Sequence, residues 1–165
     1  MGLFDKLFGK KEEINPNHIY APMAGEAVAI SQVPDPTFAE GLLGNGIAIQ
    51  PTDGKVYAPV NGTVDTMFDT GHAVSLVSDN GIEILIHVGL ETVGLNGAPF
   101  QVKVKSGQKV KKGDLLMIAD LEAIKAAGLP TITPVLVCNS DDYTTFNVST
   151  GKAVTIADVA IEVGK

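Results

Sequence analysis

Three histidines are the residues of this chain best suited to chemistry near neutral pH. His18 lies in a polar stretch and is interpreted as solvated, whereas His72 and His87 are fifteen residues apart and flank a strongly apolar segment. Neutral imidazole has a free nitrogen lone pair near pH 7. Two converging histidines can therefore bind zinc, act as acid and base, or carry a phosphoryl group, and all three chemistries stay open at this point.

The segment between these two histidines is predicted to be a β-hairpin. Residues 73–78 and 82–88 have strand character, and Asn80-Gly81 is typical of a two-residue turn. With that turn His87 would lie opposite Val74, and His72 would project from the same face on the diagonal. We therefore expect the two imidazoles to converge from backbone positions about 7–8 Å apart.

The elements that must position this hairpin are short strands. From residue 19 to the C-terminus, strand-like runs alternate with turn signals such as Asp53-Gly54 and Asn61-Gly62. One helix is predicted over residues 121–127, with Asp120 as its N-cap, and a second helical turn over residues 38–43. The pattern predicts a mainly β, single-domain antiparallel fold over residues 19–165, with one or two short helices.

The amino-acid composition excludes several classes of function. The chain has 165 residues, is 45% hydrophobic and carries a formal charge of −7, which disfavours nucleic-acid binding. All twelve basic residues are lysine, so no arginine can clamp a phosphate. The lone Cys138 cannot form an intrachain disulfide and is interpreted as a buried apolar residue. No apolar run approaches about 20 residues, and the N-terminus has neither the apolar region nor the cleavage site of a signal peptide, so the predicted location is cytoplasmic.

Residues 1–18 are interpreted as a leader that precedes the domain. Leu3, Phe4, Leu7 and Phe8 would share one face of a helix, beside several lysines. This pattern is typical of a short interfacial helix that makes peripheral membrane contact. A frayed leader is the alternative, because one or two helical turns are marginally stable alone.

A family resemblance then becomes specific. From about Tyr20 to the C-terminus the chain resembles the glucose-type enzyme IIA (EIIA) proteins of the bacterial sugar phosphotransferase system. The resemblance implies a β-sandwich of the barrel-sandwich hybrid type. The motifs that carry it are V-P-D-P-T-F-A-E at 33–40, G-N-G-I-A-I at 44–49, A-P-V-N-G-T-V at 58–64, T-G-H-A at 70–73, I-H-V-G-L-E-T-V at 86–93 and S-G-Q-K-V at 106–110.

The resemblance implies a phosphotransferase component that needs no cofactor. His87 would accept a phosphoryl group on Nε2 from the phosphocarrier protein HPr and pass it to a IIB domain of a glucose-class or related sugar permease. His72 would support the phosphoryl oxygens, Thr70 would hold His72, and the Gly89 carbonyl would fix the tautomer of His87. The partner-binding positions implied are apolar Phe38, Leu43, Phe68, Leu85 and Val93, with Asp35 and Glu91 as an acidic flank.

Further expectations and rival interpretations accompany this assignment. Zinc would bind at His72 and His87 with a partner's carboxylate, and regulated enzymes or transporters would be further partners.

A biotinyl or lipoyl carrier is disfavoured because no lysine has the required Met-Lys-Met or Asp-Lys-Ala setting. A zinc hydrolase is disfavoured because no H-x-H pair occurs. Glu91, Leu85 and Val74 depart from residues common in the family, which leaves partner preference open.

Overall fold

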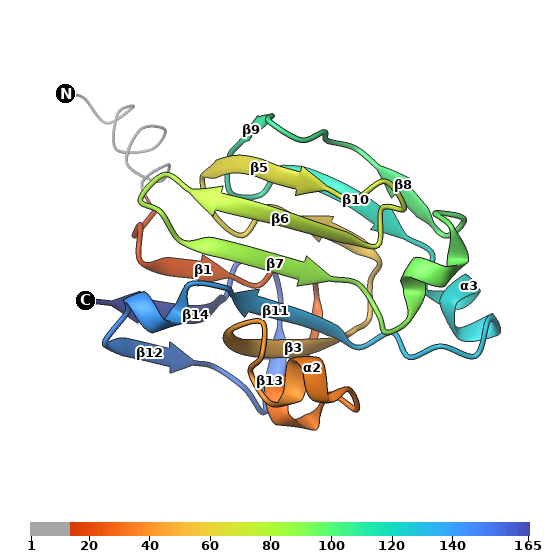
Figure 1. Cartoon of the computed structure of the whole chain (residues 1–165), viewed down its shortest axis with the longest axis horizontal. Coiled ribbons are helices and arrows are strands. Elements are labelled where there is room, and N and C mark those ends of the chain that lie inside the picture. Colours follow the sequence, from red (N-terminus) through yellow and green to blue (C-terminus); the bar gives the residue numbers. More distant parts are fainter. Residues whose placement is uncertain (1–13) are drawn as a thin grey trace, which may run out of the picture.

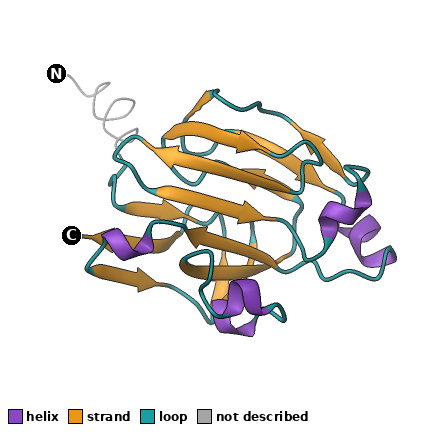
Figure 2. Cartoon of the chain, viewed as in Figure 1, coloured by secondary structure: helices purple, strands orange, loops and turns teal. Residues whose placement is uncertain are grey.

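Antiparallel strands make up most of the regular structure in the computed structural model, which describes residues 14–165 (Figures 1 and 2). The predicted membrane-binding residues of the leader lie outside this range. The strands are β1 (His18–Tyr20), β2 (Gly25–Ala29), β3 (Asn45–Pro51), β4 (Lys55–Tyr57), β5 (Gly62–Met67), β6 (Ala73–Ser78), β7 (Glu83–His87), β8 (Phe100–Val102), β9 (Lys109–Val110), β10 (Leu115–Ala119), β11 (Thr133–Val137), β12 (Thr145–Val148), β13 (Lys152–Val154) and β14 (Val159–Gly164). The two α-helices are α2 (Pro36–Ala39) and α3 (Leu121–Ala126).

The strands form three sheets. An eight-stranded sheet has the order β13-β2-β3-β11-β7-β6-β5-β9, and two three-stranded sheets have the orders β1-β14-β12 and β4-β10-β8. The pairings within these sheets are antiparallel. The prediction of a mainly β, antiparallel single domain with two short helices is therefore confirmed.

The central strands β3 and β11 are buried on both faces, whereas β7 is buried on one face and partly exposed on the other. Alternate residues such as Ile47, Val135 and Ile86 belong to the main hydrophobic core. Side chains on the opposite face form a second cluster, and the partly buried Leu85 packs against it. The buried members of this cluster are Ala48, Leu136, Phe38, Leu90, Val33 and Ile132. Because side chains alternate along a strand, His87 projects from the same face as Leu85, over this second cluster.

Each of the two α-helices begins after an aspartate that caps its N-terminus. At α3 the Asp120 carboxylate accepts a hydrogen bond from the Ala123 N–H at 3.1 Å, as the sequence predicts. The helical turn predicted over residues 38–43 instead occupies Pro36–Ala39. The shift arises because Asp35 caps the Thr37 N–H at 3.0 Å and proline is well suited to the first helical turn.

The predicted register of the β6–β7 hairpin is wrong by one residue. Ala73, not Val74, lies opposite His87, and Val74 lies opposite Ile86. The loop contains three residues instead of two, because the Gly81 N–H donates to the Ser78 carbonyl and Gly81 has a φ of 94°. Three-residue hairpin loops of this kind use a left-handed residue, which glycine adopts freely.

Two single-residue interpretations also differ from the structure. His18 is the first residue of β1 and its Nε2 lies 3.1 Å from a Glu162 carboxylate oxygen, so it belongs to a strand instead of a linker. Cys138 is exposed, because it follows the last buried residue of β11. No helix between residues 14 and 165 is long and apolar enough to cross a membrane.

Candidate functional site

His72 and His87 lie side by side in a row of four rings. The His72 and His87 ring centroids are 5.1 Å apart. Phe38 lies beyond His87 at 5.0 Å, and Phe68 lies beyond His72 at 5.4 Å. The predicted convergence of the two imidazoles is therefore confirmed.

The reason for this convergence differs from the predicted diagonal pairing. With the observed register, a continuous strand would direct His72 to the core face, alongside Val74. His72 instead precedes the first residue of β6, in a bend where Gly71 has a φ of 71°. The bend removes His72 from the strand alternation, so that its ring can contact His87.

The tautomer of His87 is fixed by its own backbone neighbour. The Nδ1–H of His87 donates to the Gly89 carbonyl oxygen at 2.8 Å. With the proton held on Nδ1, the lone pair lies on Nε2. Nε2 is therefore the nucleophilic nitrogen of this half-buried imidazole.

The loop that carries the Gly89 carbonyl is held by buried contacts. The Thr92 hydroxyl, fully buried, donates to the Val88 carbonyl at 2.6 Å. The Leu90 N–H donates to the Pro130 carbonyl at 3.1 Å. Gly89 has a φ of 74°, and a Cβ there would lie 2.7 Å from the Thr92 methyl and 2.8 Å from the Pro130 oxygen. Position 89 therefore requires glycine for both conformation and space.

His72 has a side-chain partner of its own. Its Nδ1 forms a short hydrogen bond with the Thr70 hydroxyl, and the His72 side chain is buried. A threonine hydroxyl can donate to or accept from a ring nitrogen, so this contact orients the ring in either tautomer. If the hydroxyl donates, the proton of His72 lies on Nε2.

Burial keeps both imidazoles neutral. Burial, aided by the nearby His87, lowers the pKa of His72 below its ordinary value of about 6.5. Burial also lowers the pKa of His87, and the Gly89 carbonyl and the negative charges of Asp35 and Glu91 oppose that shift. At neutral pH both rings therefore carry free lone pairs.

Several of the remaining predicted site residues lie near this histidine pair. Asp35 and Glu91 lie close enough to His87 for their charges to act on its pKa. Phe38 is buried against the His87 ring, and Leu85 packs partly buried in the same cluster. Leu43, Phe68 and Val93 are exposed large apolar side chains, as a partner-binding surface requires.

Two residues received no role from the sequence. Leu42 is 70% exposed, the most exposed large apolar side chain among residues 14–165, and it precedes the predicted Leu43. The Leu42-Leu43 pair between glycines is the signal that could have indicated both. Thr92 lies within the quoted motif, but a buried hydroxyl bonded to the carbonyl four residues earlier cannot be recognised without the fold.

The two histidines alone provide too few ligands for a zinc site. Residues 14–165 contain no group of three or more histidine, cysteine, aspartate or glutamate residues that could hold a metal ion. Zinc in proteins usually has three or four protein ligands. Zinc at His72 and His87 therefore stays a prediction that requires ligands from a second protein.

The fold and the site define a class of protein: an antiparallel β domain in which a nucleophilic imidazole lies beside a second imidazole. Residues 17–143 match the model of the family described as phosphoenolpyruvate-dependent sugar phosphotransferase system, EIIA 1. The "PTS system glucose-specific EIIA component" of Staphylococcus epidermidis is 45% identical over 153 residues, covering 92% of each chain. The component of the same name from Staphylococcus aureus is 44% identical with the same coverage.

A solved structure agrees with these sequence relationships. The glucose permease IIA from Mycoplasma capricolum superposes with a TM-score of 0.80 at 33% identity, covering 87% of this chain and 94% of that one. The chain belongs to the EIIA family of the phosphoenolpyruvate-dependent sugar phosphotransferase system. It is a phosphocarrier component of that system, and membership implies HPr and a IIB domain as its partners.

Proposed function

We propose that His87 is the phosphoryl acceptor and that the sugar served is glucose. The hydrogen bond from the His87 Nδ1–H to the Gly89 carbonyl is the observation that carries the first part, because it leaves the lone pair on Nε2. The names of the staphylococcal relatives support the second part.

The transfer is a displacement at phosphorus. The Nε2 lone pair of His87 forms the new N–P bond, while the bond from phosphorus to the donor breaks and its electron pair stays with HPr. The negative charge is spread over the three equatorial oxygens in the transition state. In a second displacement a nucleophile of the IIB domain forms a bond to phosphorus, the N–P bond breaks, and its electron pair returns to Nε2 of His87.

His72 supports that charge. When the Thr70 hydroxyl donates to Nδ1, the Nε2–H of His72 is free to donate to a phosphoryl oxygen on the neighbouring ring. A donor already in place when charge develops contributes more than one that must be reoriented. Since the chain has no arginine, HPr and IIB must provide most of the remaining positive charge.

The apolar side chains and the acidic flank serve the encounter with partners. Phe38 and Phe68 pack against the two imidazole rings, and Leu85 packs with Phe38. Together with the exposed Leu43 and Val93 they would exclude water when a partner binds, which strengthens electrostatic interactions during transfer. Asp35 and Glu91 favour a partner with a basic rim, and such steering weakens as the salt concentration rises.

The test is reconstitution with phosphoenolpyruvate, enzyme I and HPr, followed by intact-mass spectrometry. We expect one phosphoryl group on the wild-type chain and none on His87→Ala, with His18→Gln as a control for loss of a histidine elsewhere. Full labelling of His87→Ala would refute the assignment of the acceptor.

The role of His72 needs a second variant. His72→Gln should still accept the phosphoryl group, because Nε2 of His87 and the Gly89 carbonyl are unchanged. Onward transfer to IIB should slow by about 10²–10³, the usual cost of losing one preorganised donor. Transfer by His72→Gln at the wild-type rate would show that His72 has no supporting role.

The choice of sugar is tested with purified permease domains. Phosphorylated protein is offered to a glucose-class IIB domain and, separately, to IIB domains of other sugar permeases. Preferential transfer to the glucose-class domain supports glucose, and equal transfer to all of them contradicts it.

A further inference from the structure

A shallow hollow lies beside Phe68, at the His72 end of the row of four rings. Its apolar lining comes from the end of β5 and the residue after it, Met67 and Phe68, and from β8 and the chain that follows, Val102 and Val104. Phe68 and Val102 are exposed, although both are large and apolar. They leave an apolar area that another molecule can cover.

This hollow is continuous with the histidine pair. The Phe68 ring meets the His72 ring edge-on, with the centroids 5.4 Å apart. Next to it, β8 packs against the bend that turns His72 toward His87, because a Cβ at Gly71 would lie 2.9 Å from a Val102 methyl. A partner that covers His72 during transfer therefore extends onto Phe68 and Val102.

Two charged side chains lie at the rim of the hollow. Lys105 and Asp69 both line it and are exposed. Within residues 14–165, neither has an oppositely charged group at ion-pair distance. The Lys105 N–H donates to the Gln108 side-chain oxygen at 3.2 Å, and the Met67 N–H donates to the Ser106 hydroxyl at 2.9 Å. The turn that carries Lys105 is therefore fixed on β5, and each rim charge is available to a different side chain of a partner.

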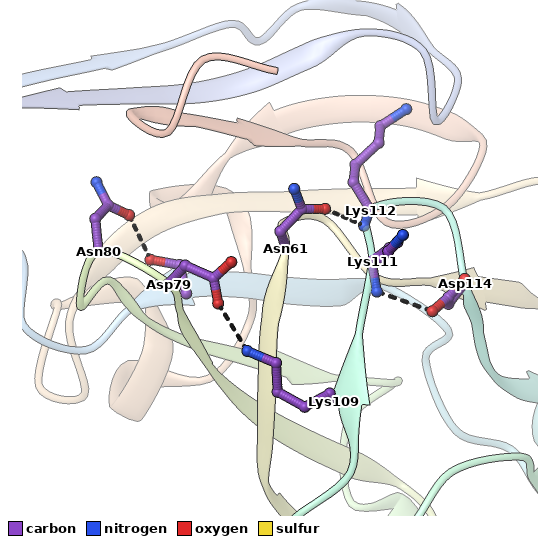
Figure 3. Close-up of polar contacts among 8 residues, drawn as sticks. Asn61, Asp79, Asn80, Lys109, Lys111, Lys112 and Asp114 are labelled. Carbon is purple, nitrogen blue, oxygen red and sulfur yellow. Dashed lines mark hydrogen bonds and ion pairs between the residues drawn. The ribbon is translucent and has the colours of Figure 1, made fainter. Parts of the chain in front are cut away.

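The lysines that follow in the sequence lie at the other end of the β6–β7 hairpin (Figure 3). There Lys109 forms an ion pair with Asp79 of the hairpin loop at 3.3 Å, and the Lys111 N–H donates to the Asp114 carboxylate at 2.8 Å. The six residues of β6 separate this loop from the histidines by about 20 Å, at roughly 3.3 Å per residue. Lys111 is therefore an exposed lysine outside the reach of a small contact around the histidines.

The two ends of the ring row differ in charge. Asp35 and Glu91 act on the pKa of His87, whereas no carboxylate contributes to the lowered pKa of His72. The His72 end has Lys105 at the rim of its hollow instead. The complement of this face is a protein with basic side chains over the His87 end and a carboxylate over Lys105.

The acidic flank alone does not distinguish one partner from another. Because the chain has no arginine, HPr and IIB must both bring positive charge to the histidines. Selection among the IIB domains of different permeases requires a contact that one domain satisfies and the others do not. An apolar hollow with a charge at its rim is such a contact, because it disfavours a polar side chain or one of the wrong charge.

We propose that Val102 and Lys105 determine which IIB domain receives the phosphoryl group. The hollow takes an apolar side chain of the IIB domain, and the Lys105 ammonium pairs with a carboxylate next to that side chain. This inference rests on the proposed transfer from His87 to IIB and adds the residues that select the acceptor. A IIB domain that has a basic side chain over Lys105 is rejected by charge.

The experiment measures kcat/KM of the full chain for transfer to a glucose-class IIB domain and, separately, for acceptance from HPr. The test variants are Lys105→Glu and Val102→Asp. The matched controls are Lys111→Glu at the loop end of the hairpin and Val148→Asp in β12, where the valine is 45% exposed compared with 42% for Val102. Thermal unfolding checks that all four variants are folded.

We expect Lys105→Glu to lower kcat/KM toward the IIB domain about tenfold, because an ion pair is replaced by a contact between like charges. Val102→Asp should lower it at least as much, since a carboxylate must then lose its water in an apolar contact. Both variants should lose much less toward HPr, and the controls should lose little toward either partner. Transfer to IIB at the wild-type rate by either test variant, equal losses toward HPr and IIB, or equal losses in the controls would overturn the proposal.

A charge exchange identifies the carboxylate on the partner. Each surface carboxylate of the IIB domain is replaced by lysine in turn, and every IIB variant is offered to the phosphorylated wild type and to Lys105→Glu. One IIB variant should accept faster from Lys105→Glu than from wild type, and a complete series without such a variant would overturn the pairing. Mass spectrometry first locates the phosphoryl group of each chain on His87, so a failure of the acceptor assignment appears before any transfer to IIB is measured.

Discussion

Replacing Gly89 by alanine should destabilise the protein more than the same change at Gly128. Both glycines have a positive φ, 74° at Gly89 and 80° at Gly128, so a Cβ costs about 1–2 kcal/mol at either position. At Gly128 nothing lies within 4 Å of the added atom. At Gly89 the Cβ would lie 2.7 Å from the Thr92 methyl and 2.8 Å from the Pro130 oxygen. Relieving that overlap adds about 1–3 kcal/mol.

Thermal unfolding gives the magnitude directly. For a domain of this size, 1 kcal/mol corresponds to about 2–4 °C in Tm. Gly128→Ala should therefore lower the Tm by about 2–8 °C, and Gly89→Ala by several degrees more. Because the Gly89 carbonyl must move, only Gly89→Ala should also slow phosphorylation by HPr, measured at a temperature where both variants are folded. Equal Tm values and equal phosphorylation rates for the two variants would refute this account of the loop.

Three more predictions concern the surroundings of the histidines. The folded-state pKa values of His72 and His87 lie below 6.5, so the unfolded chain binds protons first as the pH falls. Their contribution to stability should be complete above pH 6.5 and decline below it, and an NMR-titrated pKa above 6.5 for either ring would contradict this. Thr92→Val should cost about 1–3 kcal/mol in urea denaturation, because the buried Val88 carbonyl loses its hydroxyl donor, whereas Thr92→Ser should retain most of the stability. Asp35→Asn should keep the cap of α2 and leave the Tm nearly unchanged, yet lower the pKa of His87 further. Asp35→Ala should in addition lose about 1 kcal/mol of folding stability with the cap. A His87 pKa equal to that of wild type in Asp35→Asn would count against the charge effect.

The sequence was most informative where local chemistry decides the structure. Asp120 before a run of helix formers correctly predicts α3, and alternation along residues 82–88 correctly predicts that Ile84 and Ile86 face the core. The family motifs also led to the histidine pair, whose rings are in contact.

The sequence did not predict the details of tertiary structure. The hairpin register depends on whether the loop has two or three residues, and the Asn80-Gly81 signal is compatible with both. A one-residue change reverses the face of every side chain on a strand. The rings converge only because the Gly71 bend compensates, and neither that bend nor the contact of Pro130 with the Gly89 loop can be read from residue spacing.

The hydrogen bond from the Leu90 N–H to the Pro130 carbonyl has a consequence for how the protein folds during synthesis. Both histidines belong to one hairpin, whose ends close a short segment of chain, whereas Pro130 lies 41 residues after Gly89 and Phe38 lies 49 residues before His87. Local pairings form readily, and distant ones carry the larger entropy of loop closure. During synthesis Phe38 precedes both histidines, whereas Pro130 is added 43 residues after His87. A chain that ends before residue 130 therefore carries both imidazoles but lacks the Pro130 carbonyl that holds the loop after His87.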